Sequence, residues 1–216
     1  FEDVEATANG HSGIETNGNN TNDSVTLKNS TLNVSNGFGI YFPSSGKLTI
    51  ENSTIKAKTL GVQVCAGSLN INDGSKITVT GDAVPKTEND GAIEDGAAIS
   101  IVNRGYKPFD EIAITGGTFE SKAAAIKAYD WDNANKAEVT FTANEKVAVS
   151  GGTVSSAVKP EYCAPGFVPT QNDGTYGVEI KEDMVAEVLD AQGKTVGAYD
   201  TLTAAIAAAQ NGDTVK

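Results

Sequence analysis

Histidine, cysteine and long apolar runs are scarce in this chain of 216 residues, and each shortage removes a class of function. The single histidine, His11, excludes His-dependent catalytic triads and metal sites with several histidines. The two cysteines, Cys65 and Cys163, lie far apart in the repeat order, which favours two free, mostly buried thiols over one bridge. No apolar run approaches the roughly 18 residues that span a bilayer. No signal peptide opens the chain, which fits a mature fragment as well as a cytosolic protein.

Positive charge is also in short supply, because 16 Lys and Arg stand against 28 Asp and Glu and leave a net charge of −12. Such a surface repels polyanions, so nucleic acid is not an expected partner. The apolar content of 39% is adequate for a core but low for a compact α/β enzyme. The 23 glycines and the abundant Asn, Thr and Ser predict many turns.

One phrase occurs twice near the N-terminus, at a spacing of 22 or 23 residues. Its copies are Val25–Val34 and Leu48–Ala57, and they are followed after a turn by Gly39–Phe42 and Gly61–Val64. Each copy with its follower contains three short runs in which apolar and polar residues alternate. Three period-two runs separated by turn residues indicate three strands per coil, and a fixed period of this length predicts a solenoid.

Side chains of a strand alternate between two faces, so the aligned repeats predict an interior. The expected interior residues are Ile14, Ile40, Phe42, Val62, Val64, Ile99, Ile101 and Ile126 from the first strands, Leu27, Ile50, Ile71 and Ile114 from the second, and Leu32, Val34, Ile55, Ile77, Val79, Phe119 and Val154 from the third. Coils stacked at about 4.8 Å bury a core that no single coil can bury alone.

The outward positions bear on catalysis, because a solenoid glycosidase would carry two nearby carboxylates on neighbouring coils. The outward columns are Glu15, Tyr41, Gln63, Ser100 and Lys127, then Thr26, Thr49, Asn70, Ala113 and Ala148, and then Asn33, Lys56, Thr78, Glu120 and Ser155. No column holds two adjacent carboxylates, and no nucleophile elbow or phosphate-binding loop occurs. The sequence therefore names no catalytic residue and no cofactor, although an acid supplied by a loop would escape this comparison.

Two tripeptides, Asn29–Thr31 and Asn52–Thr54, sit in register at the bend between the second and third strands. Their amides and hydroxyls suit hydrogen bonds to the backbone and a stacked ladder. Both also match the N-glycosylation sequon, but a repeating structural position explains them better.

Together with the repeats, three later segments resemble a known family. The coils look like a right-handed parallel β-helix of the pectin-lyase-like kind over about residues 10–158, and Val149–Ser156, Tyr162–Phe167 and Asp173–Val178 resemble segments that close such domains in large surface proteins of Gram-positive gut anaerobes. The resemblance implies a β-helix at residues 1–158 and a closing or linker segment at 159–182. The same scaffold carries lyases, hydrolases and adhesins, so it says little about activity.

The tail at residues 183–216 changes character. Val185–Leu189 and Thr195–Tyr199 predict a β-hairpin, and Asp200 is expected to cap a helix that runs through Gln210. The apolar stripe of this helix is Leu202, Ala205, Ile206 and Ala209. The tail is similar to the opening of many β-helices, which implies the start of a following β-helix domain. The alternative is a C-terminal cap for the first solenoid.

Insertions into a regular solenoid are where function tends to lie. The segment Gly81–Gly96 carries Glu88, Asp90, Glu94 and Asp95, a weak candidate for calcium, but a solvated acidic loop fits their spacing better. Two further insertions, Asn103–Glu111 and Tyr129–Lys136, follow the same strand in successive coils and should emerge side by side.

Those two insertions supply the candidate ligand-binding residues, which are Arg104, Tyr106, Phe109, Asp110, Tyr129, Asp130, Trp131 and Asp132. Exposed rings beside carboxylates suit sugars, because a ring covers the C–H face and the acids accept from hydroxyls. In the alternative arrangement, Trp131 and Phe109 fold down as a small satellite core under the loops.

These observations lead us to expect a non-enzymatic adhesion or ligand-display segment, extracellular or attached to the cell wall. Glycans or host surface molecules are the expected partners, and the chain is expected to act as a monomer within a larger multidomain protein. One alternative is a carbohydrate-active lyase or hydrolase whose site lies in the loops. Another is a passive stalk that spaces domains.

Overall fold

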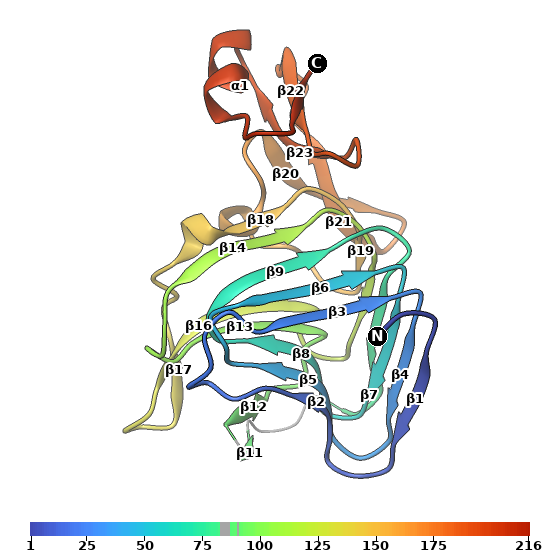
Figure 1. Cartoon of the computed structure of the whole chain (residues 1–216). Coiled ribbons are helices and arrows are strands. Elements are labelled where there is room, and N and C mark those ends of the chain that lie inside the picture. The colour runs from blue at the N-terminus through green and yellow to red at the C-terminus, as the bar shows by residue number, and fades with distance from the viewer. Residues whose placement is uncertain (83–86, 90) are drawn as a thin grey trace.

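The computed structural model describes residues 1–82, 87–89 and 91–216, and its secondary structure is almost entirely β. Most strands belong to three sheets in which neighbouring strands run parallel and come from successive repeats (Figure 1). We call these sheets first, second and third, after the order of the predicted strands in each repeat. The expectation of an all-β fold with parallel strands is confirmed.

The three sheets share one construction, in which most strands pair with the equivalent strand of the next repeat. The first sheet contains β2 (Ser12–Glu15), β5 (Phe38–Phe42), β8 (Leu60–Val64), β13 (Ile99–Asn103) and β16 (Ile126–Asp132). The second contains β3 (Ser24–Lys28), β6 (Lys47–Glu51), β9 (Gly67–Ile71), β14 (Phe109–Ile114) and β18 (Val147–Val149). The third contains β1 (Glu5–Ala8), β4 (Thr31–Val34), β7 (Thr54–Ala57), β10 (Lys76–Val79), β15 (Thr118–Glu120) and β19 (Thr153–Val154).

Strand register places the predicted interior residues on top of one another. Leu27 pairs with Ile50 and Ile50 pairs with Ile71, and all three are at most 1% exposed. The other predicted interior positions are buried as well, except Ile14, which is partly buried against the same core. The outward residues also align as predicted, with Glu15 beside Tyr41 in the first sheet. The assignment of inside and outside is therefore confirmed.

Close packing explains the glycine that precedes the first interior residue of the early first-sheet strands. A Cβ atom on Gly39 would lie 2.4 Å from the Gly61 carbonyl oxygen and 2.6 Å from Ile55 Cγ2. A Cβ on Gly61 would meet the Ala98 oxygen at 2.2 Å and Ile77 Cγ2 at 2.5 Å. The first sheet thus passes directly against side chains of the third sheet, and only a residue without a side chain fits there.

The bend between the second and third sheets holds the predicted asparagine ladder. Asn29 and Asn52 adopt φ angles of 49° and 43°, which Asn tolerates better than most residues. The Asn52 amide donates to Asn29 Oδ1 at 2.9 Å, and the Ser30 amide N–H donates to Ser53 Oγ at 3.0 Å. Gly74, with φ of 77°, comes next in this column. The prediction of a structural role for the Asn-Ser-Thr tripeptides is confirmed.

Two hairpins lie next to the first sheet, one packed on its outward face and one continuing from its strand β16. The outer hairpin, β11 (Thr87–Asn89) and β12 (Ala92–Glu94), covers the outward face of that sheet by burying Ile93 against a satellite cluster. The second is formed by β17 (Ala137–Val139), which pairs antiparallel with the end of β16. Phe141, which follows this strand, packs into the core beside Phe109.

The C-terminal end of the stack is closed by the chain itself. The strands β20 (Phe167–Asn172) and β21 (Thr175–Ile180) form a hairpin that pairs antiparallel with β19. Tyr162, in a short 3-10 helix at Pro160–Tyr162, is 1% exposed and donates its hydroxyl to the Ala128 carbonyl at 3.1 Å. A second short 3-10 helix spans Asn144–Lys146.

Beyond this hairpin lies a small lobe, built from β22 (Ala186–Leu189), β23 (Thr195–Tyr199), β24 (Thr214–Val215) and α1 (Leu202–Ala208). The predicted hairpin and helix are present, but two details were wrong. Thr201 caps the helix instead of Asp200, because Thr201 Oγ1 accepts from the Ala204 N–H at 3.1 Å, and the helix ends at Ala208, before Gln210. No helix in the described part of the chain is long and apolar enough to cross a membrane.

Both cysteines are free, as predicted, with Cys65 buried and Cys163 half-buried. Cys65 lies in the satellite cluster beneath the outer hairpin, where burial raises the pKa of its thiol to about 12. The Gln63 amide approaches its Sγ at 3.2 Å. This thiol is therefore a packing residue and not a reactive nucleophile at neutral pH.

Candidate binding site

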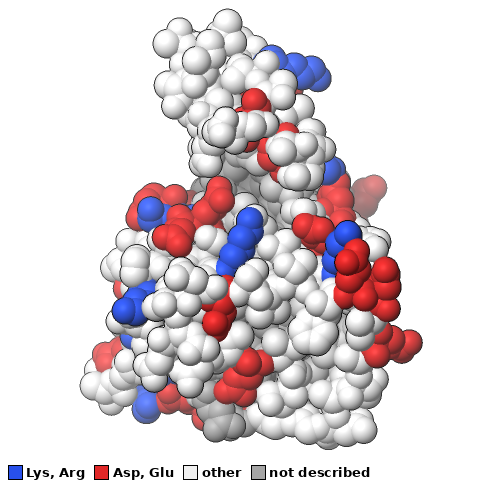
Figure 2. Space-filling model, viewed as in Figure 1, with Lys and Arg blue, Asp and Glu red and all other residues white. Residues whose placement is uncertain are grey.

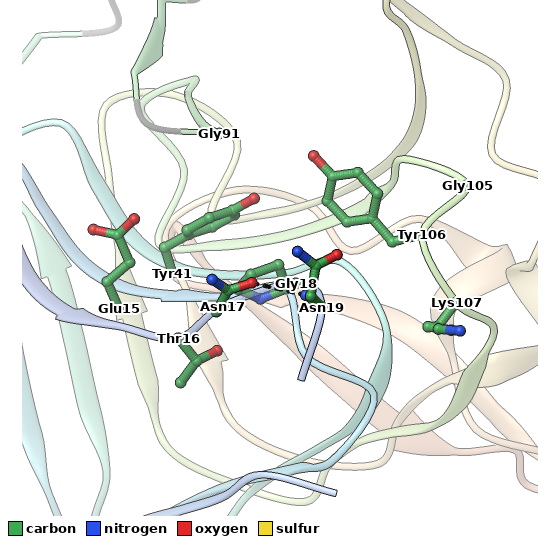
Figure 3. A pocket seen from close by; sticks show the side chains of 11 residues that line it. Glu15, Thr16, Asn17, Gly18, Asn19, Tyr41, Gly91, Gly105, Tyr106 and Lys107 are labelled. Atoms are coloured by element: carbon green, nitrogen blue, oxygen red, sulfur yellow. Dashed lines mark hydrogen bonds between the residues drawn. The ribbon is translucent and has the colours of Figure 1, made fainter. Parts of the chain in front are cut away.

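A recess of about 930 Å³ opens beside the first sheet, where loops from distant repeats meet. Its lining residues are Glu15, Thr16, Asn17, Gly18, Asn19, Tyr41, Pro43, Gly91, Gly105, Tyr106 and Lys107. Tyr41 and Tyr106 stand on two sides of it with Asn17 and Asn19 between them (Figure 3). Glu15 lies near Tyr41, and Lys107 lies at the Tyr106 end (Figure 3).

Tyr41 forms the rigid wall of the recess. It belongs to the outward column of the first sheet, next to Glu15, yet it is only 4% exposed because the outer hairpin covers that face. Burial raises the pKa of its hydroxyl, and the neighbouring Cys65 and Tyr106 raise it further. The hydroxyl therefore stays protonated at neutral pH and can donate a hydrogen bond.

Tyr106 forms the open wall, with 40% of its surface exposed. Its position depends on Arg104, whose guanidinium carbon lies 5.5 Å from the centre of the Tyr106 ring. The Arg104 side chain is 6% exposed and donates to the Gly91 carbonyl at 2.5 Å, to Glu88 Oε1 at 2.5 Å and to Asn133 Oδ1 at 2.8 Å. Arg104 thus ties the Gly91 side of the recess to the Tyr106 side, with a cation beside a ring adding to the contact.

Glu88 is the carboxylate that anchors this arginine from the outer hairpin. Lys136 donates to its Oε2 at 2.6 Å while Arg104 binds Oε1. Hydrogen bonds from Lys136 and then Arg104 hold the pKa of Glu88 below its usual value. The acid therefore remains ionised and holds the hairpin against the loop that carries Tyr106.

The structure brings only part of the predicted ligand-binding set to the recess. Tyr106 lines it and Arg104 supports it, but Trp131, Tyr129 and Phe109 are 6%, 3% and 5% exposed. Trp131 and Tyr129 belong to the satellite cluster, as the alternative for Trp131 predicted, and Phe109 packs in the main core. The expectation of exposed rings is wrong for these three, because the outer hairpin and the core cover the faces that a sugar would need.

The predicted acids are placed differently again. Asp130 accepts from the Thr142 N–H and hydroxyl, which ties the segment after β17 to β16. Asp132 accepts from the Ala134 and Asn135 amides and so holds its own turn. Asp110 lies exposed on β14, and the structure does not bring it to the recess.

The weak calcium candidates are mostly engaged by protein donors. Glu94 binds His11 Nε2 at 2.6 Å, and Asp95 accepts from the Ala97 N–H, Ser100 and Tyr129. Glu88 is bound as described above, and Asp90 lies outside the described residues. Within the described ranges, no group of three or more His, Cys, Asp or Glu side chains is placed to hold a metal ion.

Sequence reasoning missed Glu15, Asn17, Asn19, Tyr41 and Lys107 as site residues. Glu15 and Tyr41 were recognised as neighbours in an outward column, which was the available signal. The meeting of the 16–19 loop with the 105–107 loop leaves no trace in the repeat pattern, because both loops lie outside the aligned strands.

The recess is lined by hydroxyl, amide, carboxylate and ammonium groups around one exposed ring, and all of these groups form hydrogen bonds. Among the described residues that line it, Glu15 is the one that carries a carboxylate, whereas glycoside hydrolysis uses two. Comparisons with protein-family models, with curated proteins and with solved structures gave no match to this chain.

Proposed function

We propose that this chain is a non-enzymatic ligand-display segment of a cell-surface or secreted protein, and that its recess binds carbohydrate. The observation that carries the proposal is the pairing of two tyrosines, Tyr41 and Tyr106, across a recess with amide side chains between them. The scaffold that presents them is, in this proposal, a right-handed parallel β-helix.

Three features support the scaffold. Neighbouring parallel strands come from successive repeats, the three sheets enclose one core, and asparagines stack at the bend between sheets. Connections between parallel strands in one sheet are right-handed in about 98% of cases, which supports the handedness. A rigid stack of this kind suits display, because each repeat is held by its neighbours and not by a mobile domain interface.

The chemistry of the lining supports sugar recognition. The exposed ring of Tyr106 can cover the C–H face of a pyranose, while Asn17 and Asn19 can each donate and accept hydrogen bonds with hydroxyls. The Tyr41 hydroxyl adds a fixed group, since this ring is buried and cannot rearrange. Preorganised groups of this kind lower the entropic cost of binding.

The experiment is a glycan array probed with the wild type, Tyr106→Ala and Tyr106→Phe. We expect Tyr106→Ala to weaken binding to the captured glycan by about 1–3 kcal/mol, roughly 5- to 150-fold. Tyr106→Phe keeps the ring and should retain most of the affinity. Trp131→Ala, in a buried ring, is not expected to remove a ligand contact.

Two results would count against the proposal. If the wild type captures no glycan, the passive stalk becomes the better description of the chain. If Tyr106→Ala binds as well as the wild type while Trp131→Ala loses binding without losing stability, the ligand lies at the Tyr129–Lys136 insertion and not in the recess.

A further inference from the structure

The sequence contains four Asn-Gly pairs, and one of them lines the recess. The pairs are Asn9-Gly10, Asn17-Gly18, Asn36-Gly37 and Asn211-Gly212. In such a pair the glycine nitrogen can attack the carbonyl carbon of the asparagine side chain, because glycine has no side chain to shield the nitrogen or to hinder bending of the backbone. Asn17 and Gly18 both line the recess. The surroundings of each pair therefore decide which of the four reacts in the folded protein.

The turn at residues 17–20 prepares Asn17 for this reaction. The Asn20 N–H donates to the Asn17 carbonyl at 3.0 Å, and the Asn19 N–H donates to Asn17 Oδ1 at 2.9 Å. A donor at that distance stabilises the negative charge that develops on Oδ1 when its carbon is attacked. Asn17 is exposed, and no hydrogen bond joins the Gly18 N–H to another described residue. The carbon is thus activated and the attacking nitrogen is available.

The other three pairs lack this combination. The Asn36 amide donates to the Asn9 carbonyl at 2.9 Å, which holds the amino group that would have to leave. A Cβ atom on Gly37 would lie 1.6 Å from the His11 carbonyl oxygen, and the Gly37 carbonyl accepts from two N–H groups of the next repeat. This backbone is too closely packed to bend. Asn9 and Asn211 are exposed, but no N–H of a described residue donates to their Oδ1 atoms.

We propose that Asn17 is a spontaneous modification site, which converts to aspartate and isoaspartate through attack by Gly18. The Gly18 nitrogen bonds to Asn17 Cγ and gives its proton to a solvent base, while the Cγ–Nδ2 bond breaks and ammonia leaves with a proton from solvent. The resulting succinimide ring takes up one water molecule. Hydrolysis at Cγ restores the peptide bond and gives aspartate, whereas hydrolysis at the main-chain carbonyl leaves the chain joined through Cγ as isoaspartate.

The conversion changes the recess. Both products place a carboxylate between Tyr41 and Tyr106, where Asn17 has a neutral amide (Figure 3). The two N–H donors of the amide are lost, and Glu15 already contributes a negative charge to the lining. Isoaspartate also adds one carbon to the main chain and so displaces the turn. We therefore expect conversion to weaken ligand binding. This consequence rests on the proposed carbohydrate binding, whereas the chemistry at Asn17 does not.

Peptide mass spectrometry of the folded chain, incubated at pH 8, measures conversion at all four pairs. We expect Asn17 to convert roughly tenfold faster than Asn9 and Asn211, which is the value of one hydrogen bond to a developing charge. Asn36 should remain intact when half of Asn17 has converted. The same incubation in concentrated urea should bring the four rates together, because the turn and the packing at Gly37 are lost.

Gly18→Ala is the variant that tests the mechanism without removing Asn17. A Cβ atom on Gly18 would lie 3.4 Å from Pro43 and 3.7 Å from Tyr106, which are ordinary contacts, so the variant should fold. Its methyl group should slow conversion at Asn17 and leave the other pairs unchanged. The matched control is Gly10→Ala, where a Cβ meets no atom within 4 Å, and it should leave the rate at Asn17 at the wild-type value.

Three results would overturn the proposal. They are a folded protein in which Asn17 converts no faster than Asn36, a ratio of these two rates that urea does not change, and a Gly18→Ala variant that converts at the wild-type rate. The consequence for the recess is measured with Asn17→Asp, which should bind a glycan captured by the wild type roughly 2- to 12-fold more weakly. Equal binding would overturn that consequence. A wild type that captures no glycan would count against the proposed function, while the conversion rates would still decide the chemistry at Asn17.

Discussion

Replacing Gly39 with alanine should destabilise the protein, because the new methyl group has no space. It would lie 2.4 Å from the Gly61 carbonyl oxygen and 2.6 Å from Ile55 Cγ2. The oxygen belongs to a backbone held by strand pairing, and Ile55 is 0% exposed, so neither neighbour can move freely. Overpacking of this kind costs about 1–3 kcal/mol. In a domain of this size each kcal/mol lowers Tm by about 2–4 °C, so we expect a loss of roughly 2–12 °C.

The matched control is Gly10→Ala, the same change at an exposed turn. A Cβ there would meet no atom within 4 Å, so the substitution should be neutral or slightly stabilising. Thermal and urea unfolding followed by circular dichroism measure both variants. Equal stability of the two, within about 0.5 kcal/mol, would refute the close approach between the first and third sheets.

Three further outcomes follow from the packing. Trp131→Ala should cost about 3–5 kcal/mol of unfolding free energy, since its ring is 6% exposed in the satellite cluster, and a cost below 1 kcal/mol in urea unfolding would contradict that burial. Asn52→Ala should lower the free energy of unfolding by about 1–2 kcal/mol, because alanine tolerates the φ of 43° poorly. Asn52→Gly should recover part of that loss, and equal melting temperatures of the two variants would argue against the strain. A thiol reagent at pH 8 should label Cys163 in the folded protein. It should label Cys65, which is buried and whose pKa is raised to about 12, only after unfolding. Rapid labelling of both cysteines in the folded protein would show that the outer hairpin does not protect Cys65.

The regular part of the fold was readable from the sequence because it depends on local chemistry. Alternation of apolar and polar residues assigned the faces of the strands, and the fixed period was enough to align Leu27, Ile50 and Ile71 in one column. The bend at Asn29 and Asn52 was readable for the same reason, since a residue type that tolerates positive φ recurs at each copy.

The site depended on the tertiary structure. Periodicity indicates which way a side chain points but not what covers it. The pattern was therefore compatible with either exposed or buried side chains at Tyr41 and Trp131. Both are buried because the outer hairpin packs over them. The two insertions that follow equivalent strands do meet, as expected, since Arg104 donates to Asn133 Oδ1 at 2.8 Å. The recess, however, joins residues 15–19 to residues 105–107 with Gly91 beside them. Such meetings depend on loop conformation and on single long-range contacts such as Arg104 with Gly91, which no repeat encodes.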